Sequence, residues 1–315
     1  MTVRSSRGRR NGSWIPRGAL VGALGLVAAA PLVAQEPLTW GGMQAAVAER
    51  DEPGGERIAY GPGPERYGEL RVPPGAGPHP VALVLHGGCW LSIADLTYVR
   101  ELSRALNRMG WATWTLEFNR IDQEDGRWPG ILADVARGAD HLRELAATHR
   151  LDLERVVAVG HSSGGHLALW LAGRGRAEGP DGSGLRIDGV IGLAPITALD
   201  DFQARSDRCG SAIVSTLLGG EDVPPDVRDH RRASTDPGRL LPLGVPQLLL
   251  VGELDGIVPV EHVRAWARRA RAAGDPVEVR VVPGAGHFEL VAPWTAPWST
   301  VEATLDDFLR EPYGG

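Results

Sequence analysis

The chain has 315 residues, of which 43% are hydrophobic and 23% are charged, and its formal net charge at pH 7 is −6. These values are typical of a folded globular protein with a sizeable core, so they exclude general disorder. An acidic chain lacks the concentrated positive surface that nucleic-acid binding requires, and we therefore expect no nucleic-acid partner.

Residues 1–34 have a different composition from the rest of the chain. Five arginines and no acidic residue occur in this stretch, and its apolar run at 19–34 ends in small residues. This layout is typical of a secretory signal peptide that is cleaved after Ala34. A membrane anchor is the alternative, but the run is shorter than the roughly 18–20 residues that span a bilayer. We expect export to the periplasm or the cell exterior, with no stable membrane anchor after cleavage.

Short apolar runs rich in β-branched residues recur along residues 35–315, for which we expect one domain, with two domains as the alternative. The early runs 56–60 and 68–72 are weak and predict antiparallel edge strands. The stronger runs are almost continuously apolar, as in strands that are buried on both faces of a parallel sheet. These predicted strands are 81–88, 111–118, 155–160, 189–194, 247–252 and 277–282.

Segments with helical spacing separate these strands. They lie at 97–110, 131–146, 164–174, 262–274 and 299–309. Alternation of strands and helices predicts an α/β fold with a mostly parallel, doubly wound sheet and helices on both faces. Residues 195–245 show little periodicity, and we interpret part of them as a small lid over the site or as a solvent-facing insertion with one short helix.

The strongest chemical signal is Gly-His-Ser-Ser-Gly at residues 160–164, which matches G-x-S-x-G between a strand and a helix. This is the setting of a nucleophile elbow, where glycines two residues before and after the serine permit a sharp turn. Ser162 has glycine at both positions, whereas Ser163 has His161 two residues before it. We therefore predict Ser162 as the nucleophile.

The sequence His-Gly-Gly-Cys-Trp, residues 86–90, follows the predicted strand at 81–88 and suits an oxyanion hole. Backbone N–H groups about 3 Å from a developing oxyanion stabilise it. We predict these donors to be the N–H groups of Gly88, Cys89 and Ser163. His86 is interpreted as a residue that hydrogen-bonds this loop rather than as the catalytic base.

An acid and a base follow the last two predicted strands. Asp255 lies in a turn after 247–252, with Glu253 as its nearest competitor, and His287 lies in a glycine-rich loop after 277–282. A histidine that takes the serine proton, oriented by a carboxylate, makes serine nucleophilic. Ser162, Asp255 and His287 are therefore the predicted catalytic residues, and this chemistry requires no metal and no cofactor.

Side chains next to these loops are candidates for a substrate pocket. Trp90, Trp128 and Phe288 are large aromatic residues there, and His86 and His161 flank the predicted oxyanion hole and elbow. Core packing is the alternative role for each of them. The acidic net charge disfavours anionic substrates.

The chain contains two cysteines, Cys89 and Cys209, which are too few for a disulfide framework. One bridge between them fits an oxidising compartment. Two separate, small buried residues are the alternative. The sequence leaves both possibilities open.

These motifs resemble the α/β-hydrolase superfamily over nearly all of residues 35–315. His-Gly-Gly-x-Trp with Gly-His-Ser-Ser-Gly-Gly is most similar to bacterial carboxylesterases of the hormone-sensitive-lipase and feruloyl-esterase-like groups, and to arylformamidases. The resemblance implies a triad of Ser162, Asp255 and His287 that hydrolyses a small-molecule ester or amide. Cys89 departs from the pattern, because hormone-sensitive-lipase relatives often have a third glycine there.

The leading hypothesis is an exported serine carboxylesterase. The alternatives are an amide-bond hydrolase, such as an arylformamidase or exopeptidase, and a protein of hydrolase fold that only binds ligands. The sequence does not indicate the oligomeric state or the natural substrate.

Overall fold

The computed structural model describes residues 36–177, 184–205 and 208–310. The predicted signal peptide, residues 1–34, lies outside the described residues. Among the described residues, the strands are β1 (Glu56–Ala59), β2 (Tyr67–Arg71), β3 (His79–Leu85), β4 (Ala112–Leu116), β5 (Leu151–His161), β6 (Gly189–Leu193), β7 (Gln247–Gly252) and β8 (Val277–Val282). The α-helices are α1 (Trp40–Arg50), α2 (Arg100–Arg108), α3 (Gly130–Asp140), α4 (Leu142–His149), α5 (Ser163–Ala177), α6 (Leu199–Arg205), α7 (Ile213–Leu217), α8 (Pro225–Thr235), α9 (Val260–Ala272) and α10 (Trp298–Arg310).

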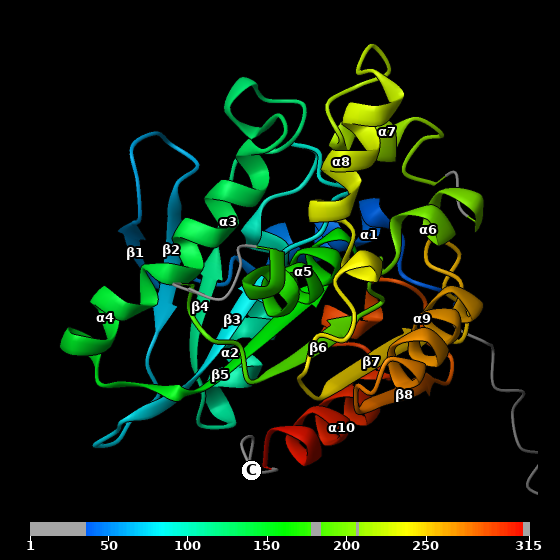
Figure 1. Cartoon of the computed structure of the whole chain (residues 1–315). Coiled ribbons are helices and arrows are strands. Elements are labelled where there is room, and N and C mark those ends of the chain that lie inside the picture. The colour runs from blue at the N-terminus through cyan, green and yellow to red at the C-terminus, as the bar shows by residue number, and fades with distance from the viewer. Residues whose placement is uncertain (1–35, 178–183, 206–207, 311–315) are drawn as a thin grey trace, which may run out of the picture. The chain divides into compact units, whose positions relative to one another are not determined.

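The described strands form one eight-stranded sheet in the order β1-β2-β4-β3-β5-β6-β7-β8 (Figure 1). The β1–β2 and β2–β4 pairs are antiparallel, and the other neighbouring strands pair in parallel. The predicted α/β fold with a mostly parallel, doubly wound sheet is therefore confirmed. Because the carboxyl ends of parallel strands share one edge, the loops after β3, β5, β7 and β8 lie near one another.

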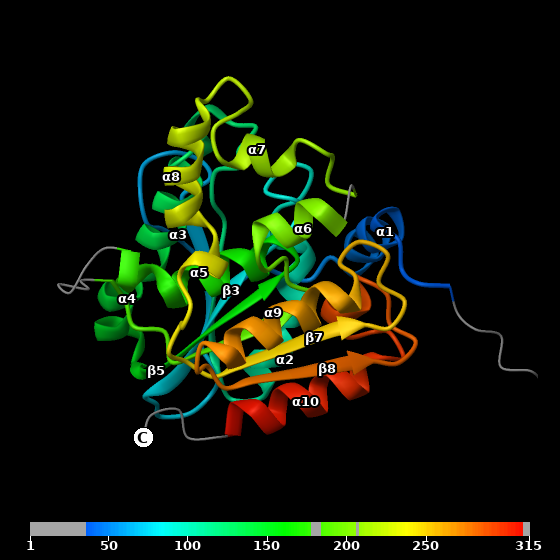
Figure 2. The ribbon, with the colours of Figure 1, turned by 45° about the vertical axis from the view of Figure 1, so that its right-hand side comes forward.

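Alternation along the strands divides the core into two layers. In β3, Val81, Leu83 and Leu85 pack in one cluster, whereas Ala82 and Val84 pack in the other. The first cluster contains side chains of α3, α4, α5, α6 and α9, and the second contains those of α1, α2 and α10. Figure 2 shows α9 and α10 beside the part of the sheet that contains β7 and β8. Helices on both faces explain why the central strands are apolar throughout.

The segment 131–146, predicted as one helix, forms two helices, α3 and α4. In a continuous helix the carbonyl of Gly138 would accept a hydrogen bond from the N–H of Leu142. Here the buried indole of Trp114 donates to that carbonyl at 2.8 Å. A hydrogen bond from Trp114 thus replaces the helical hydrogen bond of the Gly138 carbonyl at the point where the helix breaks.

Helix α1 was not predicted from the sequence. It begins after Thr39, whose hydroxyl accepts from the N–H of Gly42 and caps the helix. Two glycines, Gly41 and Gly42, occupy its first turn, and glycine has low helix propensity. The cap and the packing of Met43, which is fully buried, stabilise a helix that propensity alone disfavours.

The described residues of 195–245 include the α-helices α6, α7 and α8, of which α7 and α8 lie at the top of the view in Figure 2. The described part of this segment therefore has more helix than the one short helix expected of a solvent-facing insertion, and its role as a lid stays a prediction. A disulfide joins Cys209 of this segment to Cys89 in the loop after β3, and it spans 120 residues of sequence. The alternative of two separate cysteines is therefore wrong.

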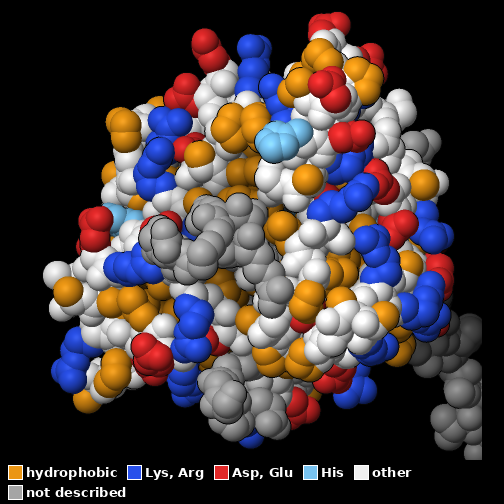
Figure 3. All heavy atoms as spheres, in the orientation of Figure 1, with side chains coloured by type: hydrophobic (Ala, Val, Ile, Leu, Met, Phe, Trp, Pro, Cys, Tyr) orange, Lys and Arg blue, Asp and Glu red, His pale blue; other side chains and the backbone are white. Residues whose placement is uncertain are grey.

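The surface shows no segregation of charge on the face drawn in Figure 3. Basic and acidic side chains are interspersed there, with hydrophobic side chains between them. Of the helices in the described part of the chain, none is both long and apolar enough to cross a membrane.

The contact between Gly68 and Trp114 provides a test of sheet packing. A Cβ on Gly68 would lie 2.4 Å from the Trp114 ring, which is fully buried. We expect Gly68→Ala to lower the free energy of unfolding by about 1–3 kcal/mol, measured by chemical denaturation, because the ring cannot move without disturbing the core. Gly41→Ala is the control, since no atom lies within 4 Å of its Cβ position. Equal losses in both variants would contradict this packing.

Candidate active site

Ser162 occupies the turn between β5, which ends at His161, and α5, which begins at Ser163. Its φ is 56°, in the left-handed region that disfavours side chains. The flanking glycines make the turn possible: a Cβ on Gly160 would lie 2.1 Å from the carbonyl oxygen of Gly164. The Ser162 N–H donates to the carbonyl of Leu193 at 2.9 Å, which ties the turn to β6.

The two adjacent serines have different surroundings. Ser162 lines a pocket. The hydroxyl of Ser163 accepts a hydrogen bond from the N–H of Trp90 at 3.2 Å, so it connects the elbow to the loop after β3. The sequence had suggested only the backbone N–H of Ser163 as functional, and its side chain has this additional contact.

The loop at 86–90 has left-handed backbone at three consecutive positions, with φ of 106° at Gly88, 55° at Cys89 and 61° at Trp90. It lies close to the elbow, since a Cβ on Gly87 would lie 2.8 Å from the carbonyl oxygen of His161. Among the described residues, no acceptor takes the N–H groups of Gly88 and Cys89. Ser163 opens α5, so its N–H belongs to the first turn, which has no helical acceptor.

Asp255 and His287 are in direct contact. The Nδ1 of His287 donates to Oδ2 of Asp255 at 2.8 Å, and Oδ1 accepts from the N–H groups of Ile257 and Val258, also at 2.8 Å. Because a carboxylate only accepts, the proton lies on Nδ1 and leaves Nε2 as an acceptor. The competitor Glu253 instead accepts from the N–H of Gly284 at 3.0 Å.

A pocket of about 180 Å³ joins these elements. Of the predicted site residues, Ser162, His287, Gly88, Cys89, His161 and Phe288 line it. The sequence did not indicate the other lining residues, which come from several parts of the chain. They are Trp40, Ile93, Tyr98, Arg208 and Ile257.

Three predicted pocket residues, His86, Trp90 and Trp128, do not line this pocket. His86 is buried against Phe118, with ring centroids 4.4 Å apart, and its Nδ1 lies 2.8 Å from the carbonyl oxygen of Gly87. This agrees with the loop-holding role predicted for it. Burial works to raise the pKa of Glu117, but the neighbouring His86 and Arg120 outweigh it and lower that pKa.

The two tryptophans point elsewhere. Trp90 is 1% exposed and packs edge-on against His166, with ring centroids 5.2 Å apart. The indole of Trp128 donates to the hydroxyl of Thr235 at 3.0 Å, and the guanidinium of Arg231 lies 4.5 Å from its ring centroid. Both are therefore packing residues, which corrects their assignment to the pocket.

A chain of hydrogen bonds links the loop at 86–90 to His287. The hydroxyl of Tyr98 accepts from the N–H of Gly87 and donates to Nδ1 of His161 at 2.8 Å. Nε2 of His161 then donates to the carbonyl of His287 at 3.1 Å. Burial, with a further contribution from His287, holds the pKa of His161 well below its usual value. A neutral His161 therefore holds the backbone of His287 in place.

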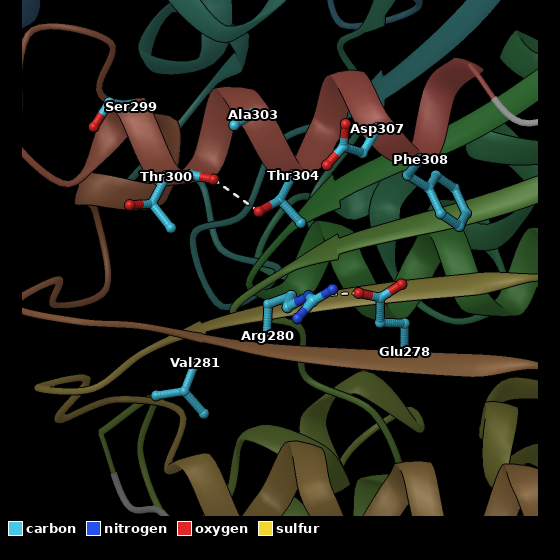
Figure 4. A pocket seen from close by; sticks show the side chains of 9 residues that line it. All are labelled: Glu278, Arg280, Val281, Ser299, Thr300, Ala303, Thr304, Asp307 and Phe308. Atoms are coloured by element: carbon cyan, nitrogen blue, oxygen red, sulfur yellow. Dashed lines mark hydrogen bonds and ion pairs between the residues drawn. The ribbon is translucent and has the colours of Figure 1, made fainter.

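A second hollow, of about 670 Å³ between β8 and α10, has a mixed polar and apolar lining that includes the Glu278–Arg280 ion pair and the Thr304–Thr300 hydrogen bond (Figure 4). It contains no histidine. Within the described residues, no group of three or more His, Cys, Asp or Glu side chains could hold a metal ion.

The sheet order, the elbow after β5 and the loops at one sheet edge define an α/β-hydrolase fold. Two similar solved structures show the same fold: esterase B from Lactobacillus rhamnosis, with 19% identity, a TM-score of 0.69 and coverage of 86% of this chain and 92% of that one; and esterase LipW from Mycobacterium marinum, with 19% identity, a TM-score of 0.65 and 85% coverage of each chain.

Residues 70–269 match the family model described as BD-FAE, and the chain belongs to this family. It is similar to esterase LipC of Mycobacterium tuberculosis, with 27% identity over 248 residues, 75% of this chain and 60% of that protein. Esterase LipQ of the same organism is 24% identical over 267 residues, 82% of this chain and 62% of LipQ. The chain thus spans about three fifths of the length of these relatives.

His166 in α5 provides a test of the buried histidines around the elbow. Burial lowers its pKa to about 3, and its Nε2 donates to the carbonyl of Thr235 at 3.0 Å. A histidine whose pKa is depressed in the folded state contributes stability above its unfolded pKa of about 6.5, and this stability is lost as the pH falls below that value. We expect the free energy of unfolding to fall between pH 6.5 and pH 5, with a slope of up to about 1.4 kcal/mol per pH unit from this group.

Chemical denaturation of the parent and of His166→Gln at several pH values measures this slope. The variant keeps a side-chain donor but does not titrate, so its slope should be shallower by up to about 1.4 kcal/mol per pH unit. His161 contributes in the same direction in both proteins and therefore cancels in the comparison. Identical slopes would show that His166 is not held neutral by burial.

Proposed function

We propose that the chain is a serine hydrolase that cleaves carboxylic esters through an acyl-enzyme on Ser162. The observation that carries this proposal is the hydrogen bond between Nδ1 of His287 and Asp255. The same His287 lines one pocket together with Ser162. The names of the curated relatives, both esterases, support the ester as the substrate bond.

The reaction follows from the chemistry of these groups. Nε2 of His287 takes the proton of the Ser162 hydroxyl as its oxygen attacks the carbonyl carbon, and Asp255 stabilises the resulting imidazolium. The N–H groups of Gly88, Cys89 and Ser163 donate to the oxyanion. The imidazolium protonates the leaving alcohol, the acyl group stays on Ser162, and water then attacks the acyl carbon with His287 as the base again.

The size and lining of the pocket limit the substrate. Its volume of about 180 Å³ is below the roughly 300–1,000 Å³ of pockets that hold drug-sized ligands. Trp40, Ile93, Ile257 and Phe288 give it an apolar lining. We therefore propose short esters, with a small group on at least one side of the carbonyl, as substrates.

We propose in addition that the chain is exported through residues 1–34. The basic and apolar composition of that segment supports export. The disulfide between Cys89 and Cys209 supports it independently, because such bonds persist mainly in oxidising compartments.

The division of roles between the two serines can be tested by substitution. We expect Ser162→Ala to lower kcat for a p-nitrophenyl ester by at least ~10⁴-fold, because the triad acts as a unit. Ser163→Ala removes one hydrogen bond to the Trp90 N–H and should lower kcat by about tenfold or less, the usual value of one such bond. Steady-state kinetics with both folded variants measure these effects. Comparable losses would mean that the nucleophile is wrongly assigned.

A substrate panel separates ester hydrolysis from amide hydrolysis. The parent protein is compared on short p-nitrophenyl esters, an aryl formamide and an aminoacyl anilide. We expect the highest kcat/KM on a short ester. Higher activity on the formamide or anilide would favour the amide-bond hydrolase, and failure of Ser162 to react with a fluorophosphonate probe would favour a protein that only binds ligands.

The proposed export predicts the N-terminus of the mature chain. Intact mass measured on protein secreted by a bacterial host should correspond to a new N-terminus near Gln35. A signal peptidase cleaves after small residues, so a bulky substitution, Ala34→Trp, should reduce processing. An unprocessed chain that remains in the membrane fraction would contradict the proposal.

A further inference from the structure

Glu289 is a buried acidic residue that the proposed reaction does not use. It lies two residues after His287, at the start of the short 3-10 helix Glu289–Val291, and is 5% exposed. Its Oε2 accepts a hydrogen bond from the N–H of Gly286 at 3.0 Å, and its Oε1 accepts from the N–H of Leu38. One side chain therefore joins the residue before His287 to the segment that precedes α1.

Packing at Gly286 reinforces this connection. A Cβ on Gly286 would lie 2.6 Å from the Cβ of Pro37, so the segment before α1 contacts the backbone of the loop directly. A Cβ on Gly252, the last residue of β7, would lie 2.2 Å from the carbonyl oxygen of Gly286. The loop that carries His287 thus packs against both the end of β7 and residues 37–38.

The same N-terminal segment continues into the wall of the pocket. Trp40, the first residue of α1, lines the pocket together with Ser162 and His287. Its ring centroid lies 5.5 Å from that of Tyr98 and 5.6 Å from that of Phe288. These ring contacts do not involve the buried carboxylate, so the wall of the pocket and the catalytic loop can be perturbed separately.

We propose that Glu289 is a positioning residue for the catalytic base. By joining the loop of His287 to residues 37–38, its carboxylate fixes the backbone from which the imidazole reaches Ser162. This inference rests on the proposed function and adds a residue to it. Asp255 orients the ring of His287, whereas Glu289 supports the backbone that carries the ring. Such support matters because a misplacement of about 1 Å can cost about 100-fold in rate.

Glu289→Gln tests this role, because a carboxamide has one accepting oxygen and an NH₂ group that only donates. The variant keeps the shape of the side chain but can accept from only one of the two backbone N–H groups. We expect kcat for a short p-nitrophenyl ester to fall by roughly 10- to 100-fold. KM should change by less than about twofold, because the interaction acts on the transition state and the apolar wall stays in place. Steady-state kinetics with the folded variant measure both constants.

Asp275→Asn is the matched control. Asp275 is 4% exposed and accepts from the N–H groups of Leu243 and Gly244 at 2.8 and 2.7 Å. It also accepts from the side chain of Gln247, which begins β7, so it supports the end of that strand remote from the site. Both variants should lower the midpoint of chemical denaturation, because each leaves a buried N–H without its acceptor. We expect a large fall in kcat for Glu289→Gln alone.

Pro37→Gly tests the same contact from the other side. It removes the Cβ that packs on Gly286, and it loosens a segment that precedes α1 and lies outside the hydrophobic core. We expect kcat to fall by about threefold or more. In the double variant with Glu289→Gln, the combined loss should be smaller than the product of the two single losses, because both changes act through one contact.

An unchanged kcat in Glu289→Gln, or an equal loss in Asp275→Asn, would overturn the role of Glu289. If Glu289→Gln does not fold, an unchanged kcat in Pro37→Gly overturns it instead. The parent protein separates this failure from failure of the proposed function. If the parent does not hydrolyse the ester, ester hydrolysis itself is contradicted, whereas turnover with an unchanged kcat in the variants contradicts only the positioning role.

Discussion

The rest of the site depends on the sharp turn at residues 160–164, where the backbone passes close to the end of β3. The chain turns from β5 into α5 within one residue, and a Cβ on Gly164 would lie 2.2 Å from the carbonyl oxygen of Leu85 at the end of β3. Ser162 adopts a left-handed conformation there, which is unfavourable for a residue with a side chain and persists only where its surroundings enforce it. Two backbone hydrogen bonds enforce it: the Ser162 N–H donates to the carbonyl of Leu193, and the Ser162 carbonyl accepts from the N–H of Ile196. The sheet therefore orients the serine.

The parallel sheet brings the remaining groups to the same edge, and side-chain hydrogen bonds align them. Loops after β3, β7 and β8 carry the predicted oxyanion donors of residues 88–89, Asp255 and His287. Tyr98 and His161 bridge two of these loops, from the N–H of Gly87 to the carbonyl of His287. Because burial keeps His161 neutral, this bridge carries no charge that could compete with the Asp255–His287 pair.

The sequence predicted what depends on chain order and on strong local patterns. The boundaries of β7 and β8 agree with the predicted runs because these runs are short, apolar and bounded by turn residues. Parallel topology then placed Asp255 and His287 at one edge. The pocket lining could not be predicted this way, because Trp40, Tyr98 and Arg208 reach it from distant segments. Trp90 was predicted to line the pocket because it follows the loop at 86–89 in sequence. Its backbone is left-handed, and its side chain is buried in the core instead.

Net charge and local charge act on a substrate at different distances. The negative charge of the chain is distributed over its surface and is screened beyond about 8–10 Å at physiological ionic strength. It therefore affects the approach of an anion more than its bound state. Close to the site, charges of both signs are present: the Asp255 carboxylate contacts His287, and the exposed Arg208 is among the residues that line the pocket. The charge of the whole chain therefore does not describe the charges that a bound substrate meets, and composition alone is a poor guide to the substrate.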